Sequence, residues 1–396
     1  MNDKHACCIG CGATDTETLV DFGTQPPHNR FLKAREIVRD RHPLVIGVCG
    51  KCGLIQLKDP MPPSMVRSHH EWLTYNEPEG HLDALVEHLA ARIAPDAKIF
   101  GLSYKDDSTL ARFEKLGYGA TFRYDMKADL GINDPCAGLE TIQALMTEEQ
   151  AAELAMKHGK ADLLIVRHVL EHAHDPSGFM KALGKLVNPG GKIVFEMPDC
   201  RKFVDACDYS FVWEEHISYF SQSTMKGFAF RNGFAVEEML AYPYPFEDSL
   251  IAVLTAGNAS RETLPDEAEI ASARRFAAHF DSAKKAYRDY FSRLHASGKH
   301  IAVFGAGHLA AKFLNLFDLK DFFDYVIDDN PHKQGLAMPG SGLPIVDSSH
   351  LPETDLCMLS LSPESEQKVL ARQQAYVQYG GRFFSIFALS PSALKP

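Results

Sequence analysis

The sequence predicts an α/β protein in which two doubly wound, Rossmann-like domains follow one another and a small zinc-binding lobe precedes them. Two Cys-x-x-Cys pairs lie in the first 66 residues, and from residue 98 to about 253 short apolar runs alternate with helical patterns. Such alternation is typical of a mostly parallel sheet covered by helices. It starts again at residue 299. We therefore expect a lobe at 1–66, a domain at 67–257, a helical connector at 258–298 and a second domain at 299–396.

Composition and charge restrict the classes of partner. The 396-residue chain is 45% hydrophobic and 23% charged, which is ordinary for a globular protein. A formal net charge of −11 argues against a nucleic-acid or anionic-membrane surface. The first residues lack the regions of a signal peptide, and no apolar run is long enough to span a bilayer. We expect a cytoplasmic protein that is a monomer or a homodimer and binds neither nucleic acid nor membrane.

The first lobe holds five of the nine cysteines, and four of them predict a structural zinc site. Cys8 and Cys11 form one Cys-x-x-Cys pair, and Cys49 and Cys52 form the other. A glycine follows each pair and leaves the backbone free to turn its amides toward sulfur. Four thiolates complete a tetrahedral Zn²⁺ site with no open position. The alternatives are four unrelated buried cysteines, a redox pair, or a competing ligand in Cys7.

The domain at 67–257 has six candidate strands. They cover residues 98–102, 120–124, 163–166, 192–196, 235–240 and 250–254. Helices are expected from Gly80, with Leu82, Leu85, Leu89 and Ile93 on one face, and from about 177 to 187, where Asn188-Pro189-Gly190-Gly191 breaks the pattern. Gly233 reads as a helix C-cap before a strand. Residues 258–298 predict one long helix or a helix pair that ends at Gly298.

Ionisable side chains gather after the strands at 163–166 and 192–196 and shortly beyond. In an open α/β sheet, ligands bind outside the carboxyl ends of the strands. We therefore expect the reaction centre between residues 161 and 220. The side chains are Arg167, His168, Glu171, His172, His174 and Asp175, followed by Glu214, Glu215 and His216. Tyr75, Asn76 and Glu77, in a polar and aromatic loop, either line this site or form a helix N-terminal turn.

The last domain begins with a glycine turn after a strand. Gly305-Ala306-Gly307 lies between a strand at 299–304 and a helix, and Asp328 follows the next strand. This context matches the dinucleotide-binding fingerprint. The alternative is a turn that closes a Rossmann-like unit with nothing bound. His308 is interpreted as a helix-start residue.

Taken together, these motifs resemble the sugar C-methyltransferase family, which adds a methyl group to carbon of a nucleotide-linked keto-deoxysugar. The resemblance covers nearly the whole chain. It includes the two cysteine pairs, Arg167–His172 (RHVLEH), the PGG turn and the pattern Glu215-His216-x-x-x-Phe220. It implies a zinc-binding lobe, an S-adenosylmethionine-binding domain and a C-terminal Rossmann-like domain that helps to enclose a small-molecule nucleotide sugar. It does not imply NAD in the last domain.

Methyl transfer to carbon needs a base that removes the proton beside a carbonyl, and a base poised near neutrality favours histidine. His216 could be this base, with Glu215 as the residue that orients it. His172 could be a second base or a donor to the enolate oxygen, which needs waiting donors. Tyr75 and Tyr219 are further candidate hydroxyl donors. We expect His216, Glu215, His172 and Tyr75 as the catalytic set.

For S-adenosylmethionine, the expected contacts are Gly101, Ser103, Asp125 and Arg167. Asp125, after the second strand, could hold ribose hydroxyls. The turn after the first strand departs from the family pattern because only Gly101 is kept and Lys105 adds positive charge beside a cationic sulfonium. Asp106 or Asp107 could offset that charge. The family also implies a tyrosine where this chain has Trp213, which can stack but cannot carry a proton.

Other functions stay open at this point. A relative with the same scaffold could perform other carbonyl-sugar chemistry without methyl transfer. An oxidoreductase could bind NAD at Gly305 and Gly307 with Asp328. A non-enzymatic assembly subunit is disfavoured, because so many ionisable groups at strand ends are costly without a chemical use.

Overall fold

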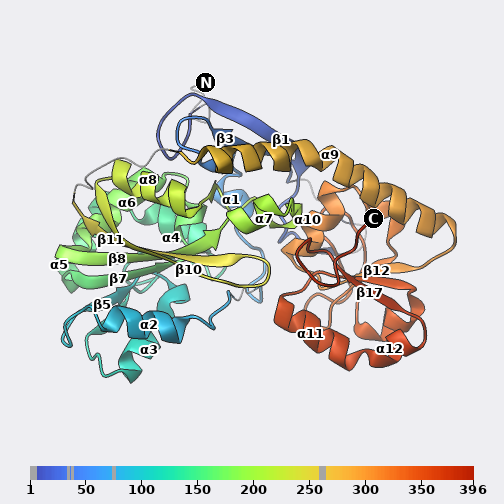
Figure 1. The fold of residues 1–396 in the computed structure, drawn as a ribbon. Coiled ribbons are helices and arrows are strands. Elements are labelled where there is room, and N and C mark those ends of the chain that lie inside the picture. The colour runs from blue at the N-terminus through green and yellow to red at the C-terminus, as the bar shows by residue number, and fades with distance from the viewer. Residues whose placement is uncertain (1–6, 34–35, 37–39, 74–76, 258–264) are drawn as a thin grey trace.

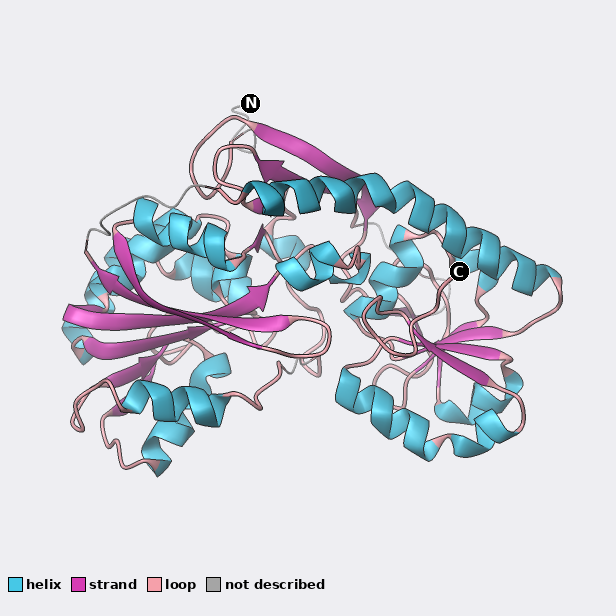
Figure 2. Cartoon of the chain, viewed as in Figure 1, coloured by secondary structure: helices cyan, strands magenta, loops and turns pink. Residues whose placement is uncertain are grey.

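The protein is described from a computed structural model that covers residues 7–33, 36, 40–73, 77–257 and 265–396. Figure 1 shows an N-terminal lobe at the top, a sheet domain on the left and a second sheet domain on the right. Figure 2 shows helices on both faces of each large sheet. The predicted fold class, two doubly wound domains after a small lobe, is confirmed. Within the described residues, no helix has both the length and the apolar character needed to cross a membrane.

The N-terminal lobe is built on a four-stranded antiparallel sheet of order β1-β3-β4-β9. Its strands are β1 (Thr16–Gln25), β3 (His42–Cys49), β4 (Ile55–Leu57) and β9 (Ser218–Tyr219). The last strand comes from the middle of the chain, directly after the Glu214–His216 cluster. The short helix α1 (Pro63–Val66) leads out of the lobe. The lobe sheet is therefore completed by, and attached to, the segment predicted to carry the catalytic base.

The middle domain contains a six-stranded sheet of order β10-β11-β8-β7-β5-β6, in which β11 runs antiparallel to its neighbours. The six predicted strands are all present. Their bounds are β5 (Ile99–Gly101), β6 (Thr121–Arg123), β7 (Ala161–Arg167), β8 (Val187–Asp199), β10 (Phe234–Tyr242) and β11 (Asp248–Ala256). β5, β6, β7 and β8 are parallel, so their carboxyl ends meet at one edge.

Helices cover both faces of this sheet because its buried strands are apolar on both sides. In β7, Leu163 and Ile165 face α2 and α3, whereas Leu164 and Val166 face α4, α5, α6 and α8. The helix bounds are α2 (Leu82–Ala90), α3 (Asp107–Lys115), α4 (Leu139–Leu145), α5 (Glu148–His158), α6 (Pro176–Lys185), α7 (Arg201–Asp205) and α8 (Gln222–Arg231). Short 3₁₀ helices are η1 (Tyr104–Asp106), η2 (Leu170–His172) and η3 (Tyr209–Phe211).

The C-terminal domain is a five-stranded parallel sheet of order β15-β13-β12-β16-β17. Its strands are β12 (Ile301–Phe304), β13 (Tyr325–Ile327), β15 (Ile345–Val346), β16 (Leu356–Leu359) and β17 (Arg382–Ser385). Its helices are α10 (His308–Leu316), α11 (Pro363–Arg372) and α12 (Gln374–Gln378), with 3₁₀ turns η4 (Lys320–Phe322) and η5 (Ser348–Glu353). The strand β14 (Leu336–Ala337) pairs with β2 (Leu32–Lys33) of the N-terminal lobe.

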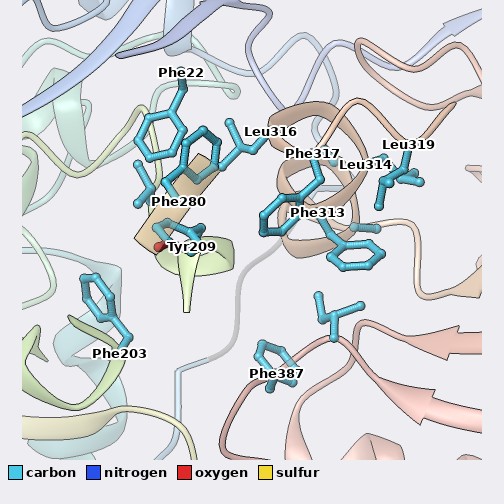
Figure 3. Close-up of a cluster of buried hydrophobic side chains, with 14 of the residues drawn as sticks. Phe22, Phe203, Tyr209, Phe280, Phe313, Leu314, Leu316, Phe317, Leu319 and Phe387 are labelled. Carbon is cyan, nitrogen blue, oxygen red and sulfur yellow. The ribbon is translucent and has the colours of Figure 1, made fainter. Parts of the chain in front are cut away.

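A single long helix, α9 (Glu267–Ala296), connects the domains and resolves the choice left open by the sequence. It runs across the top of the molecule from the N-terminal lobe to the C-terminal domain (Figure 1). Gly298 follows it with φ 73°. Under it lies an aromatic core shared by all parts of the chain (Figure 3), where Phe22 of β1 packs on Tyr209 of η3 and Phe280 of α9. The domains therefore pack as one body.

Two local predictions need correction. The Pro-Gly-Gly turn was expected to separate a helix from a strand, but α6 ends at Lys185 and the turn lies inside β8. The ladder to β7 shifts there, because Gly190 has φ 79° and interrupts regular pairing. Ile93 was expected on the face of the first helix, but α2 ends at Ala90 and Ile93 packs from the following turn.

Candidate active site

The four cysteines predicted to bind zinc lie together. Cys8, Cys11, Cys49 and Cys52 each place a sulfur within 4.8 Å of the other three. Gly12 and Gly53 have φ of 72° and 77°, a conformation that glycine adopts without strain, and their amides donate to the carbonyls of Cys8 and Cys49. Hydrogen bonds to neighbouring thiols and burial raise the pKa of Cys8, so the thiolates need a cation beside them. These residues fit a Zn²⁺ ion.

The predicted polar clusters meet at the carboxyl ends of β7 and β8. Arg167 ends β7, His168 follows it, and η2 carries Glu171 and His172. The loop before β9 brings His216 against η2, where the amide of Ile217 donates to the carbonyl of Glu171 at 2.7 Å. Asp175 does not belong to this group of side chains, because its carboxylate caps α6 by accepting from the amide of Gly178.

His172 and His216 form the centre of the site. Their rings meet edge to face with centroids 4.9 Å apart. Burial lowers the pKa of both imidazoles, and the positive charges of His168 and Lys105 lower the pKa of His172 further. Both rings are therefore neutral near pH 7 and able to accept a proton. Among the described residues, no hydrogen-bond partner reaches Nδ1 of His172, which is 5% exposed.

Glu171 is the carboxylate that faces His216. One ligand atom from each of Glu171, His172 and His216 lies within 4.8 Å of the other two, so this group has the residue types that could hold a divalent cation. The negative charge of Glu171 raises the pKa of His216 against the effect of burial. Glu171 is buried, and neither of its carboxylate oxygens has a hydrogen-bond partner in the described part of the chain. It can therefore orient an imidazolium that forms at His216.

Glu215, which was expected to orient His216, lies toward the N-terminal lobe. Its carboxylate accepts from Asn29 at 3.4 Å and lies 3.7 Å from Nε2 of His28. Burial and the neighbouring charges of Glu214 and Glu140 raise its pKa well above the usual range. Adjacent residues in an irregular segment point in different directions, which explains why sequence neighbourhood was a poor guide. Glu215 thus stays a candidate catalytic residue in a different position from the one expected.

A network of charged side chains that the sequence did not reveal lies next to His172 and His216. His168 has φ 54°, which is uncommon for a residue with a side chain, and its ring nitrogens lie 3.4 Å from Glu171 and 3.4 Å from Glu196. Glu196 also accepts from Arg167, Ser249 and His81. Burial opposes a charged His168, but Glu77, Glu171 and Glu196 outweigh it and raise its pKa to about 10. His168 is therefore a buried cation.

This cation predicts a pH-dependent stability. The pKa of His168 is raised from 6.5 to about 10, so its contribution is fully present below pH 6.5 and is lost as the pH rises toward 10. His168→Asn removes the charge and keeps a residue that tolerates positive φ. We expect this variant to lose a few kcal/mol near pH 6.5. Thermal unfolding at pH 6.5 and pH 10 should show the difference from the parent protein shrinking at the higher pH; a constant difference would contradict it.

The turn after β5 is closed by its own residues. Asp106 accepts hydrogen bonds from the amides of Leu102, Ser103 and Arg167, and the Ser103 hydroxyl accepts from the amide of Lys105. A Cβ atom on Gly101 would lie 2.8 Å from Cβ of Asp106. Gly101 is therefore required for packing inside the turn. In this arrangement Gly101 and Ser103 shape the turn from within, and neither presents a polar side-chain atom outward.

Arg167 has a similar supporting position. Its side chain is 2% exposed, and its guanidinium contacts Glu196, the carbonyl of Lys105 and the hydroxyl of Ser108. It connects β7 and β8 to the turn after β5. Arg167 thus holds this turn in place, and its direct contact with S-adenosylmethionine stays a prediction.

The glycine turn of the C-terminal domain is also satisfied internally. Asp328, which the dinucleotide fingerprint would place on a ribose hydroxyl, accepts from the amide of Ala306 at 2.9 Å and from Lys333 at 2.9 Å. Gly305 lies against Ser360 and Leu361 with no room for a side chain. The turn therefore closes the domain by itself. His308 starts α10, as expected, and stacks on Trp213 with centroids 4.2 Å apart.

The two tyrosines predicted as donors have different outcomes. Tyr75 lies outside the described residues, as does Asn76. Tyr219 is described and buried, and its hydroxyl donates to the carbonyl of Trp213 and accepts from its amide, both at 2.9 Å. The suggestion that Tyr219 donates to substrate is therefore wrong, because its hydroxyl stabilises the segment from Trp213 to Tyr219.

Comparison with known proteins identifies the relatives of this arrangement. Three family models match the chain: a zinc binding domain over residues 8–66, a methyltransferase domain over residues 128–239 and a C-methyltransferase C-terminal domain over residues 258–388. A related protein, the C-methyltransferase NovU of Streptomyces niveus, is 23% identical over 411 residues and covers 95% of this chain and 94% of its own.

The chain matches these models in the order zinc-binding domain, methyltransferase domain and C-methyltransferase C-terminal domain. It is an S-adenosylmethionine-dependent methyltransferase with a zinc-binding lobe. Among solved structures, a methyltransferase from Anabaena variabilis is 13% identical, covers 45% of this chain and 86% of its own, and has a TM-score of 0.33. The magnesium protoporphyrin IX methyltransferase from Synechocystis with bound S-adenosylmethionine is 14% identical, covers 44% and 78%, and has a TM-score of 0.29.

The residues of this C-methyltransferase fit S-adenosylmethionine at the ends of β5 and β6. Asp125 is exposed after β6; one of its oxygens caps the turn by accepting from Lys127 and Ala128, and the other has no protein hydrogen bond among the described residues. That oxygen can accept from ribose hydroxyls. Tyr104, 45% exposed at the tip of the closed turn, offers an aromatic surface that the sequence did not single out.

The charge conflict at Lys105 is resolved by a residue from another segment. Asp106 and Asp107, proposed to offset the Lys105 charge, have other roles: Asp106 is inside the turn, and Asp107 pairs with Arg123 at 2.6 Å. Glu77 instead approaches the Lys105 ammonium at 3.1 Å. Burial opposes ionisation of Glu77, but His168 and Lys105 lower its pKa to about 2. The charge of Lys105 is therefore offset by Glu77 beside the turn where the cationic cofactor is expected.

This fit predicts a binding effect at Asp125. Asp125→Ala should weaken binding of S-adenosylmethionine by about 10–150-fold, since a charge-assisted hydrogen bond contributes roughly 1.5–3 kcal/mol. Asp125→Asn, which keeps a capping oxygen, should weaken it less. Isothermal titration with S-adenosylhomocysteine provides the measurement. Asp107→Asn, which changes an acid of the neighbouring turn, is the control and should bind as the parent protein does; equal affinity in Asp125→Ala would contradict the assignment.

Several residues of the site gave little signal in the sequence. His28 lies in an irregular segment of the zinc lobe, and its contacts to the site depend on the tertiary fold. His168 was visible only as a strand-end residue, because its charge comes from acids on three other segments. Lys312, whose ammonium pairs with Glu214, could have been noticed as the one lysine in the mostly apolar helix HLAAKFLNL.

Proposed function

We propose that this enzyme methylates carbon beside the carbonyl of a nucleotide-linked keto-deoxysugar, with His216 as the base. The observation that carries the proposal is the pair of neutral imidazoles of the buried His172 and the partly buried His216, at the same edge of the sheet as Asp125. A neutral imidazole can remove a proton from carbon only if the resulting carbanion is stabilised, as it is beside a carbonyl. Methyl transfer to carbon requires such a nucleophile.

Each residue of the pair has a distinct part in this proposal. His216 accepts the proton from the substrate carbon, and the carboxylate of Glu171 stabilises the imidazolium that results. A hydrogen bond to the main chain of Glu215 orients the His172 ring, and its Nδ1 has no described partner. This arrangement favours His172 as a second acceptor over the alternative role of donor.

Positive charge near the pair favours enolate formation. Lys105 and His168 both lower the pKa of His172, so their positive potential reaches the ring. The same potential stabilises negative charge that develops on the carbonyl oxygen. When bound, S-adenosylmethionine supplies an electrophilic methyl group. The chain's part is to remove the proton, to stabilise the enolate and to hold its carbon in line at short range.

The nucleotide-sugar substrate rests on the family resemblance and on the order of the three modules. The net charge of −11 is compatible with a small phosphorylated ligand, which needs only a local positive site. We also propose a cytoplasmic location, since the nine cysteines are all described and form no disulfide.

The test combines two measurements on the parent enzyme. A thymidine-diphosphate-linked 4-keto-deoxysugar is incubated with S-adenosylmethionine, and the product is expected to gain one CH₂ in mass on carbon. In D₂O with S-adenosylhomocysteine in place of the donor, the proton beside the carbonyl should exchange. The same sugar reduced to the alcohol should do neither. Methylation on oxygen or nitrogen, or methylation of the alcohol, would overturn the proposal.

A further inference from the structure

Lys312 is a buried cation whose position the reaction does not explain directly. It lies in α10 of the C-terminal domain and is 2% exposed. Phe313, Leu314 and Leu316 of this helix, and Phe317 just after it, pack into the shared aromatic core (Figure 3). An ammonium in such a place is costly unless a charge is paired with it. Its ammonium forms an ion pair with Glu214, whose carboxylate is also buried.

Glu214 is also contacted by His28, which belongs to the N-terminal lobe. Its Oε1 accepts from the main-chain amide of His28 at 2.6 Å and lies 2.9 Å from Nδ1 of the same histidine. Oε2 faces Lys312. One carboxylate is thereby held by the N-terminal lobe and by the C-terminal domain. Glu214 is 1% exposed, so neither contact is weakened by bulk water.

The segment that starts beside Glu214 is the one that carries His216. Trp213 stacks on His308 of α10 at 4.2 Å, with an interplanar angle of 9°. At its other end, Tyr219 lies in β9, which pairs with β4, and its hydroxyl returns to the backbone of Trp213. The loop from Trp213 to Tyr219 is thus attached at both ends, and the Glu214 ion pair attaches its start to two domains.

A buried ion pair is not needed for stability, because apolar side chains of similar volume often stabilise a core as well or better. What the pair provides is a fixed geometry. A catalytic base must be held within a fraction of an ångström of its productive position. Lys312 meets that need because it pairs with Glu214, which lies two residues before His216 in the chain.

We propose that Lys312 is a positioning residue, which acts through Glu214 to fix the segment carrying Glu215 and His216. The link to catalysis rests on the proposed function, whereas the fixing of the segment does not. The C-terminal domain, whose glycine turn is closed by Asp328, then contributes to the reaction through a side chain instead of a bound nucleotide.

The pair also has a pH signature. The charged and titratable groups that face Glu214 are Lys312 and His308 from α10, His28 from the N-terminal lobe, Tyr219 of β9 and the adjacent Glu215. Burial opposes ionisation of Glu214, but Lys312 and His28 outweigh it and hold its pKa well below the usual range. Without Lys312 the pKa of Glu214 rises. In a Lys312→Met enzyme, kcat should therefore show a further decrease on the acidic side of its pH profile, where Glu214 becomes protonated.

The experiment compares Lys312→Met with Lys333→Met, which removes a lysine from the same domain that pairs with Asp328 and does not touch the segment. Hydrogen–deuterium exchange with mass spectrometry is followed in the peptide of residues 211–220. We expect exchange of this peptide to be at least about tenfold faster in Lys312→Met and unchanged in Lys333→Met. kcat should fall by about 10–100-fold, while KM for S-adenosylmethionine stays within about twofold.

Two further variants keep the proposal open to refutation. Lys312→Met/Glu214→Gln removes both charges and avoids a lone buried carboxylate, so it should fold even where the single variant does not. It is expected to show the same fast exchange in residues 211–220, and its kcat should equal that of Glu214→Gln. Unchanged exchange in the folded Lys312 variants, or additive losses in kcat, would overturn the proposal. If the Lys312 variants exchange fast but the parent enzyme does not methylate the keto sugar, only the proposed function is overturned.

Discussion

Replacing His216 with glutamine is expected to lower kcat by about 10³-fold. General-base catalysis contributes roughly 10²–10⁴-fold, so the barrier should rise by about 4 kcal/mol. Glutamine is close to imidazole in size and keeps a hydrogen-bonding side chain but cannot take a proton from carbon. Binding of S-adenosylhomocysteine should change little, because His216 lies on the η2 side of the site and the proposed ribose contact, Asp125, follows β6.

The pH profile checks the same assignment. Burial lowers the pKa of His216 from its usual value of 6.5. The neutral base is present at pH values above this lowered pKa and is lost as the pH falls through it. kcat/KM of the parent enzyme should therefore fall only on the acidic side of pH 6.5, and the residual activity of His216→Gln should lack this limb. His88→Gln changes a histidine on α2 that pairs with Glu238 and serves as the control. Full activity in His216→Gln would exclude His216 as the base.

Loss of one zinc ligand is expected to destabilise the whole protein. Cys8, Cys49 and Cys52 belong to the same buried cluster as the side chains of β7, β8 and α8, so the metal site is part of the core of the middle domain. A structural zinc contributes roughly 10–16 kcal/mol in small zinc peptides, and loss of one ligand should remove at least about 4 kcal/mol of that. For a chain of 396 residues such a loss lowers Tm by roughly 5 °C.

Cys49→Ser is the variant to measure, by calorimetry and by metal analysis. It should bind less than one zinc per chain and unfold at the lower temperature, whereas the parent protein should hold one zinc. Cys7→Ser is a matched control, since Cys7 lies beside the site in sequence but outside the four-cysteine group. Equal zinc content and Tm in Cys49→Ser, or an equal loss in Cys7→Ser, would show that the four sulfurs do not form the site.

Much of the architecture could be predicted because it follows from local pattern. Apolar runs such as residues 163–166 have only one stable place, inside a sheet covered on both faces, and β7 is found there. The cysteine spacing requires two tight turns, and the turns at Gly12 and Gly53 bring the sulfurs together. Gly233 and Gly298 end helices for the same kind of local reason.

The site was predictable in part. His172 and His216 were both expected in the reaction centre between residues 161 and 220, and they lie 4.9 Å apart. The direction of each side chain was not predictable from neighbourhood in sequence. Glu215 turns toward His28, and Glu171 takes the place facing His216. The turn at Gly101 likewise proved to be closed by Asp106, whose role depends on amides from two strands.

The amino-acid sequence by itself determined the three modules, the cysteines that cluster as zinc ligands and the edge of the sheet where ionisable side chains gather, because periodicity and ligand spacing act over a few residues. Only the tertiary structure decided which charges meet. His168 becomes a cation because three acids surround it, and Lys312 reaches Glu214 across a domain boundary. Burial and Coulomb interaction depend on distances between segments far apart in the chain, and those distances exist only after folding.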